Sequence, residues 1–215
     1  MYLYGRKINQ YNLTQDDQIK EILQPYTLTA TRKEVGFEHE PTDQLHTIKL
    51  KKRTRVLIAA SHKDQMLLGY PLDSTMAEMQ AVYQLSGGGY NTPDGYRILS
   101  KEKIKYIRKH FDPNTTAIMS HFIEERDRLS QIFPNVYSST SHAEGVDLSR
   151  FRHLIIYSMS FSTSKYIQRR ARQANINRKE PITVHYLLAD AGLDRHLYDT
   201  VAIKKKNFTG RIYGK

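Results

Sequence analysis

The feature that most constrains the fold is the regular alternation of helix-like and strand-like segments after Ser100. The strand-like segments are short, uninterrupted apolar runs at 116–120, 153–158 and 181–188. Between these runs, apolar residues recur every three or four positions, which is typical of amphipathic helices. Strands that alternate with helices pair in parallel, and the helices cover both faces of their sheet. The sequence therefore predicts an α/β fold.

The expected helices have recognisable ends. Serine side chains are suited to cap a helix N-terminus, and glycine and proline end helices. The expected helices run from Asp73 or Ser74 to the glycines at 87–89, from Ser100 to Asp112, from about Phe122 to Pro134, from Ser162 to about Ala174, and onward from about Leu193.

Composition narrows the class of protein. The 215 residues include 33 Lys and Arg against 22 Asp and Glu, a formal net charge of +11, which favours a polyanionic partner. An apolar fraction of 39% is enough to bury a core, which excludes a disordered chain. Cysteine is absent, which excludes disulfides and thiolate sites. The chain has no membrane-length apolar run and no signal-peptide core at its start, so we expect a soluble protein.

Two segments carry candidate chemistry. The first, 138–148, offers hydroxyls at Thr140 and Ser141, a glycine that allows close backbone approach, and a carboxylate at Asp147. The second, 166–175, would place Gln168 and Arg172 on one helix face, with Arg169 on a neighbouring stripe. Grouped guanidinium groups can bind a phosphate in bidentate fashion. Each segment alone is also compatible with an ordinary solvated surface. Their occurrence in this order, on either side of one buried strand, is stronger evidence for a functional site.

These segments resemble a known family. Ala143–Ser149, Leu154–Tyr157 and Tyr166–Arg172 closely resemble motifs V and VI of superfamily 2 helicases and translocases, in the Swi/Snf-like form of phage-encoded helicases. Ala117–Leu129 resembles the strand and helix of motif IV, and Gln84–Ile104 the linker into the second lobe. The similarity covers most of residues 75–205.

The resemblance implies a RecA-like parallel sheet that forms the second lobe of a two-lobe motor, with ATP in the cleft between the lobes. By that analogy Gly145 and Asp147 lie near the nucleotide ribose. Arg172 reaches the γ-phosphate as an arginine finger, and Gln168 and Arg169 hold the geometry of the cleft.

The resemblance also implies contacts with DNA, single- or double-stranded. Thr140 or Ser141, together with the backbone near Ser120 and His121, would contact the phosphates of the tracked strand. Contacts of this kind suit a translocase because they carry no sequence information. The absence of cysteine and of a signal-peptide core indicates a cytoplasmic location, and the phage-type resemblance is compatible with the cytoplasm of an infected bacterial host.

The chain departs from the family in three ways. It contains no G-x-x-x-x-G-K-[ST] phosphate loop and no acidic magnesium motif, so we expect a separate first lobe, in cis or in trans, to supply both, and Mg²⁺ with them. Asn175 stands where the family often has a further arginine, and the segment 134–140 is short. Alone, the chain should not hydrolyse ATP. The alternative is a catalytically inactive module, derived from such a lobe, that binds nucleic acid or protein.

The expected organisation has two parts. Residues 1–70 form a basic, helical N-terminal extension or a linker from a preceding lobe, and residues 71–215 form the helicase C-terminal lobe. The run 48–55 alone carries five basic residues. The sequence leaves open whether residues 1–60 belong to this lobe. The histidine spacings match no zinc pattern, so no metal site is expected in this chain.

Overall fold

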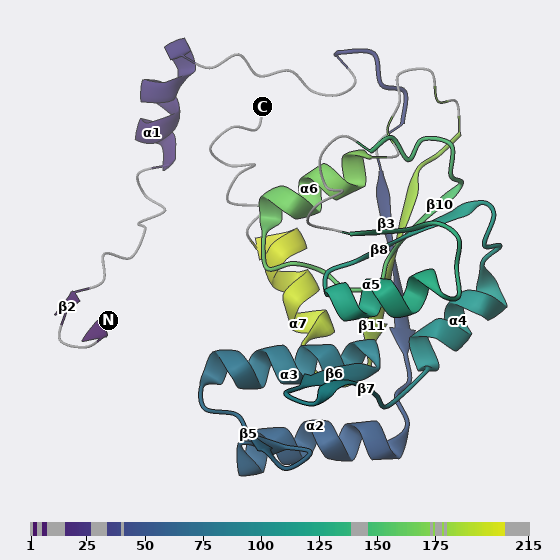
Figure 1. Ribbon diagram of the computed structural model, residues 1–215. Coiled ribbons are helices and arrows are strands. Elements are labelled where there is room, and N and C mark those ends of the chain that lie inside the picture. Colours follow the sequence, from purple (N-terminus) through teal and green to yellow (C-terminus); the bar gives the residue numbers. More distant parts are fainter. Residues whose placement is uncertain are drawn as a thin grey trace.

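A parallel sheet lies at the centre of the computed structural model (Figure 1). The structure describes residues 2–3, 6–7, 16–26, 34–39, 41–138, 146–172, 174, 178 and 180–204. Its strands are β1 Tyr2–Leu3, β2 Arg6–Lys7, β3 Thr42–Ile48, β4 Met66–Leu67, β5 Tyr70–Pro71, β6 Gly89–Thr92, β7 Gly95–Ile98, β8 Thr116–Ser120, β9 Val136–Ser138, β10 His153–Ile156 and β11 Thr183–Ala189. Its helices are α1 Asp16–Leu23, the 3₁₀ turn η2 Gln24–Tyr26, α2 Lys52–Asp64, α3 Thr75–Gly87, α4 Glu102–His110, α5 Ile123–Ser130, α6 Thr163–Ala171, α7 Asp194–Tyr198 and the π-helical turn η3 Asp199–Lys204.

Within the described residues, five strands form the central sheet in the order β3-β11-β10-β8-β9. All four pairings are parallel. In register, Leu154 of β10 lies between Ala117 of β8 and Val184 of β11. The carboxyl ends of the strands therefore meet along one edge of the sheet, and their amino ends along the opposite edge.

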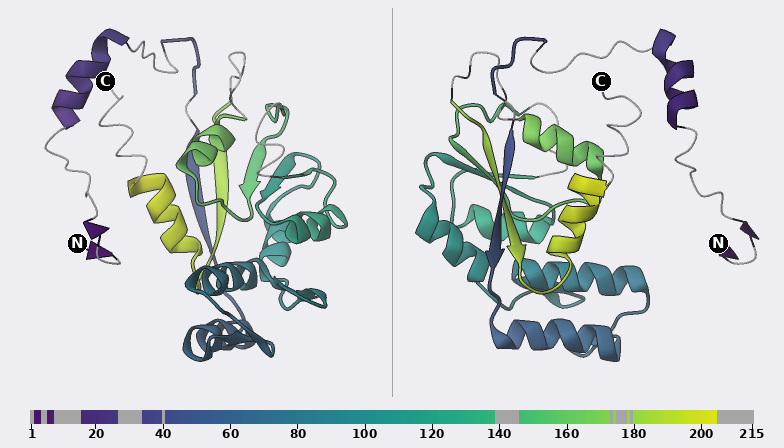
Figure 2. Two further views of the ribbon diagram at one scale, coloured as in Figure 1. Left: turned by 60° about the vertical axis from the view of Figure 1, so that its left-hand side comes forward. Right: turned by 180° about the vertical axis from the view of Figure 1, so that it is seen from behind.

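Alternate residues of the strands face two separate cores. On one face, Met119, Leu154 and Tyr186 pack with side chains of α6, α7 and η3. On the other face, Ile118 and Ile155 pack with side chains of α4 and α5. Figure 2 shows this arrangement in its left view, with α7 on one side of the strands and α4 and α5 on the other. Burial on both faces explains why these strands are continuous apolar runs.

A third cluster lies beyond the carboxyl ends of β3 and β11. Leu50 and Ala189, which end those strands or follow them, pack against α2 and α3 through Ile58, Val82 and Leu85. Figure 1 shows the two helices beneath the sheet. The helix α3 begins at the N-cap Ser74, whose hydroxyl accepts from the Ala77 amide, and ends at Gly88 with φ +101°.

The α/β prediction is confirmed, and the three apolar runs form β8, β10 and β11. Segments on both sides of residue 71 take part in the sheet and in the layer beneath it. The strand β3 pairs along its whole length with β11, from Thr42–Thr183 to Ile48–Ala189, and α2 packs on α3. Segments before residue 71 thus complete the sheet and the layer beneath it.

Two short features were not expected from the sequence. The strand β9 is the outermost strand on one side of the sheet, and its Ser138 pairs with Ser120 of β8. The strands β6 and β7 form a hairpin, in which Thr92 pairs with Gly95. No helix among the described residues has the length and apolar character needed to cross a membrane.

Candidate functional site

The helix α6 carries Gln168 and Arg169, two of the residues singled out in the sequence, and Arg172 is its C-cap. Its N-cap is Ser162, whose hydroxyl accepts from the Lys165 amide at 3.4 Å, as the sequence predicts. The helix follows β10 and returns across one face of the sheet. Its last residues therefore lie at the amino edge, next to the segment that leads into β10.

The amino edge brings the two candidate segments together. The Leu148 amide donates to the Arg172 carbonyl at 3.1 Å, and Leu148 is fully buried. Arg172 is the half-buried C-cap of α6, and its Nε is buried without a hydrogen-bond partner among the described residues. A buried guanidinium nitrogen without a partner is energetically costly, so this position favours an acceptor beyond the described residues.

Asp147 lies next to this junction and is exposed. The Ser149 amide donates to its Oδ1 at 2.8 Å and the Ser149 hydroxyl to its Oδ2 at 3.0 Å. These bonds, the backbone one foremost, hold the pKa of Asp147 below its usual value. The carboxylate is therefore ionised, and able to accept hydrogen bonds, at neutral pH.

Gln168 and Arg169 are neighbours in the sequence, but their side chains lie in different environments. Gln168 is exposed on α6, whereas Arg169 is 2% exposed. Burial lowers the pKa of Arg169 to about 10, and the nearby phenols of Tyr83 and Tyr186 act in the opposite direction. The structure thus turns Arg169 into the core and leaves Gln168 on the surface.

Ser120 and His121 lie at the opposite, carboxyl edge of the sheet. The four-residue step from Thr116 to Ser120 along β8 separates the edges by about 13 Å. Ser120 is buried, and the His121 amide donates to Ser158 Oγ at 2.7 Å. Burial, and then the charges of Arg169 and Lys165, lower the pKa of His121 to about 4, so its ring is neutral.

A groove of about 420 Å³ opens beside His121. It lies between α3 and the start of α5, and its lining includes the exposed apolar side chains of Met76, Ile123 and Phe161. Three expected site residues, Thr140, Ser141 and Gly145, lie outside the described residues. The first two follow β9, which ends at this same edge.

Behind the carboxyl edge lies a buried polar network that the sequence did not reveal. The Ser158 hydroxyl donates to Glu125 Oε2, and Lys103 pairs with Asp194 at 2.7 Å. Burial raises the pKa of Glu125 to about 7. These residues come from three helices and the loop after β10, so no local spacing could have identified them.

Asp43 of β3 anchors this strand to the helices on one face. It accepts from Arg170 Nε at 2.6 Å, from the Tyr198 hydroxyl at 2.7 Å and from the Tyr166 hydroxyl. Arg170 belongs to the arginine-rich helix but is committed to this internal pair. The anchor confirms that β3 is an integral strand of the sheet.

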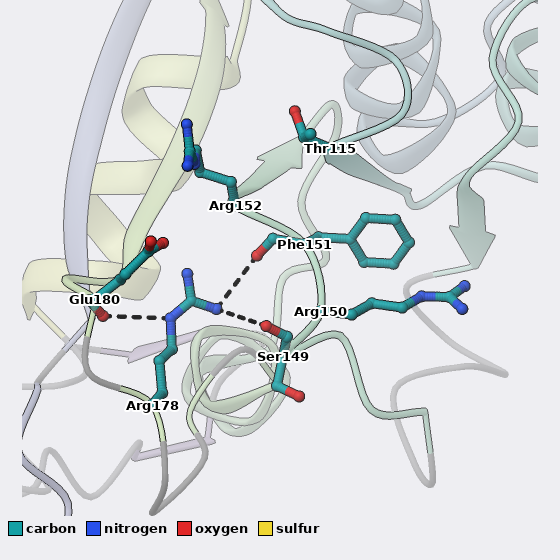
Figure 3. A pocket seen from close by; sticks show the side chains of 7 residues that line it. All are labelled: Thr115, Ser149, Arg150, Phe151, Arg152, Arg178 and Glu180. Carbon is teal, nitrogen blue, oxygen red and sulfur yellow. Dashed lines mark hydrogen bonds between the residues drawn. The ribbon is translucent and has the colours of Figure 1, made fainter.

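A second pocket of about 420 Å³ opens at the amino edge (Figure 3). Arg178 crosses it, donating from Nη1 to the carbonyls of Ser149 and Phe151 and from Nε to that of Glu180. Arg150, Arg152 and Thr115 complete the lining. Among the described residues, no group of three or more His, Cys, Asp or Glu side chains could hold a metal ion.

Comparison with known proteins finds one family match and similar solved structures. Residues 91–177, less than half of the chain, match the family model of the helicase conserved C-terminal domain. The matched range contains every site residue expected from the sequence. One similar solved structure is the crystal structure of the C-terminal part of the Fun30 ATPase domain, with 10% identity, a TM-score of 0.48, and coverage of 76% of this chain and 89% of that one. No curated protein matches the chain.

Proposed function

We propose that this chain is the second lobe of an ATP-dependent DNA helicase or translocase. In this proposal a first lobe with a phosphate loop, in the same or another polypeptide, holds ATP and Mg²⁺, and the amino edge of the present sheet closes over the nucleotide. The match of residues 91–177 to the helicase C-terminal domain supports the general assignment. The observation that carries the finer one is the hydrogen bond from Leu148 to Arg172, which joins the two candidate segments.

The amino edge fits a nucleotide. Asp147 is an exposed, ionised carboxylate able to accept from ribose hydroxyls. The Nε of Arg172, which has no hydrogen-bond partner among the described residues, supplies a donor that is already desolvated. ATP supplies the phosphoryl group that is transferred to water. Arg172 stabilises the charge that develops on that group during transfer, and because it is delivered from a second lobe, it links hydrolysis to closure of the cleft.

The carboxyl edge is the proposed contact for the DNA backbone. The groove beside His121 and the end of β9 lie there, about 13 Å from the amino edge. Lobe closure at one edge can therefore move the contact at the other. Gly145, Thr140 and Ser141 retain the roles that the resemblance gives them, and Gln168, exposed on α6, remains available to the cleft. Arg169 supports α6 from beneath, because its side chain is buried.

The test is DNA-stimulated ATP hydrolysis by this chain together with its phosphate-loop lobe. Arg172→Ala should lower kcat about 1,000-fold, as expected for loss of an arginine finger, with a smaller change in KM for ATP. Arg195→Ala is the matched control, because Arg195 is exposed on α7 and pairs only with Asp199 among the described residues. Equal turnover by the Arg172 and Arg195 variants would contradict the finger role.

One observation favours the alternative, a binding module without turnover. Asn175 stands where the family often has a second arginine, and the next arginine, Arg178, donates to three backbone carbonyls. An inactive module would bind DNA equally well with and without Arg172 and show no hydrolysis with any first lobe. Binding to DNA, measured by fluorescence anisotropy, should in either case weaken steeply with salt.

A further inference from the structure

The lining of the pocket at the amino edge carries more positive than negative side chains. Its lining contains the guanidinium groups of Arg150, Arg152 and Arg178 and the single carboxylate of Glu180. Among the described residues, none of these three arginines forms an ion pair. Arg170 differs from them, because it forms an ion pair with Asp43 at 2.6 Å.

Arg178 is fixed in place but only partly used. Its Nη1 donates to the Ser149 carbonyl at 2.9 Å and the Phe151 carbonyl at 3.2 Å, and its Nε to the Glu180 carbonyl at 3.3 Å. Its Nη2 makes no hydrogen bond to a described residue. Figure 3 shows that nitrogen pointing away from the carbonyls of Ser149 and Phe151, on the side where Arg152 lies. A rigid guanidinium with an edge that no described residue contacts is pre-organised for an anion.

The other two arginines differ in their availability. Arg152 is exposed, and its guanidinium makes no hydrogen bond or ion pair with a described residue. Arg150 points away from Arg178 in Figure 3, with its guanidinium 4.7 Å from the centre of the Phe151 ring and Nη2 3.4 Å from the Tyr137 hydroxyl. Arg152 and Arg178 are therefore the pair able to face one ligand, with the Thr115 hydroxyl on the same lining.

We propose that Arg152 and Arg178 form a binding site for a phosphate group carried by a nucleotide or by a nucleic-acid strand. Guanidinium groups match the geometry of phosphate oxygens, and two of them facing one open pocket suit a single multivalent anion. Glu180 opposes the anion and sets the affinity to a moderate level. Arg172 does not line this pocket, so the site is separate from the proposed arginine finger.

The test is calorimetric titration of the whole chain with inorganic pyrophosphate at low salt, which needs no first lobe and no hydrolysis. Arg152→Gln should weaken binding about tenfold, the effect of losing one charge-assisted hydrogen bond. Arg178→Gln should weaken it at least as much, and Arg152 keeps the test decisive if the carbonyl contacts of Arg178 prove essential for folding. Glu180→Gln should tighten binding, because it removes the opposing charge.

Arg195→Gln, on α7, is the matched control and should leave pyrophosphate binding unchanged. An equal loss in the Arg195 and Arg152 variants would reveal diffuse attraction by net charge and overturn the proposal, as would the absence of binding to the wild-type chain. Competition then identifies the source of the phosphate. Displacement of pyrophosphate by ATP assigns a nucleotide, displacement by a single-stranded oligonucleotide assigns a strand, and displacement by neither contradicts the proposal.

Discussion

Two charge clusters, one near each edge of the sheet, differ in burial and in pairing. The cluster at the carboxyl edge is buried, and its charges are compensated within the chain. Lys103 and Asp194, each with a side chain 2% exposed, pair at 2.7 Å, and Arg128 donates to the carbonyls of Gly88 and Ser100 at 3.1 and 2.7 Å. At the amino edge Arg152 is exposed, and no described residue pairs with it.

Burial and pairing thus distinguish charges that stabilise the fold from charges that remain accessible to a ligand. A buried ion pair holds its elements in a fixed arrangement, because removing either partner leaves an uncompensated charge. An exposed, unpaired guanidinium contributes little to stability but adds to the field that attracts an anion. The carboxyl-edge network therefore positions the groove beside His121, whereas the amino-edge arginines provide binding capacity.

The largest effect is expected from breaking the buried pair. Asp194→Ala leaves the Lys103 ammonium without its carboxylate and removes the acceptor of the Ala189 amide, so it should lower the free energy of unfolding by about 3–5 kcal/mol. Urea denaturation measures this loss. Asp199→Ala, which breaks the exposed pair with Arg195, is the control and should cost less than about 1 kcal/mol. Similar losses in both variants would remove the distinction between buried and exposed charge.

The next effect is a pH dependence centred on Glu125. Its pKa is raised from 4.5 to about 7 by burial, so the folded state binds a proton that the unfolded state releases. Wild-type stability should therefore fall by roughly 3 kcal/mol as the pH rises from below 4.5 to above 7. Glu125→Gln removes this contribution. The stability difference between variant and wild type should change over that pH range, and a constant difference would contradict the buried ionisation.

A smaller effect of opposite sign is expected from a row of histidines on three adjacent strands. His185 Nδ1 lies 2.9 Å from His46 Nε2, and its Nε2 lies 3.1 Å from His153 Nδ1. The row continues to the Tyr106 hydroxyl, 2.8 Å from His46 Nδ1, and the Phe111 ring packs against all three imidazoles. Burial, foremost, lowers the pKa of His185 to about 4 and also lowers the pKa values of His46 and His153.

Because the folded-state pKa of His185 lies below its unfolded value of 6.5, its stabilisation is present above pH 6.5 and is lost as the pH falls toward 4. His185→Gln keeps hydrogen-bonding capacity without titrating in this range. Between pH 7 and pH 5 the variant should lose about 2 kcal/mol less than the wild type in urea denaturation. His196→Gln, at an exposed position on α7, should follow the wild-type curve. If the His185 variant does so as well, the histidine row does not titrate as one buried unit.

The sequence predicted the central strands and the helix α6 because their signals are local. The strands β8, β10 and β11 are buried on both faces and so consist of apolar runs, and Ser162 caps α6 directly. The strand β3 was not predicted, because it carries polar residues and its partner β11 lies about 140 positions away in the chain. The three residues of β9 are too few for a periodic pattern.

The candidate site was predicted in part for the same reason. Motif spacing indicated that the segments of Asp147 and Arg172 belong together, and the Leu148–Arg172 hydrogen bond joins them. Helical spacing could not tell which of two adjacent residues, Gln168 and Arg169, faces the core. The hydrogen bonds of Asp43 with Arg170 and of Arg178 with the Ser149 carbonyl join segments that are distant in the sequence. Local patterns do not encode such contacts.

The smallest effect on stability, and the sharpest test of the comparison between the edges, is expected from Arg152→Ala. The guanidinium of Arg152 has no described partner, so its removal should change the free energy of unfolding by no more than about 0.5 kcal/mol. Pyrophosphate should raise the thermal midpoint of the wild-type chain, because a ligand that binds only the folded state stabilises it, and this rise should shrink in the variant. A large stability loss without phosphate would show that Arg152 supports the fold as Lys103 does, and the contrast between the edges would then fail.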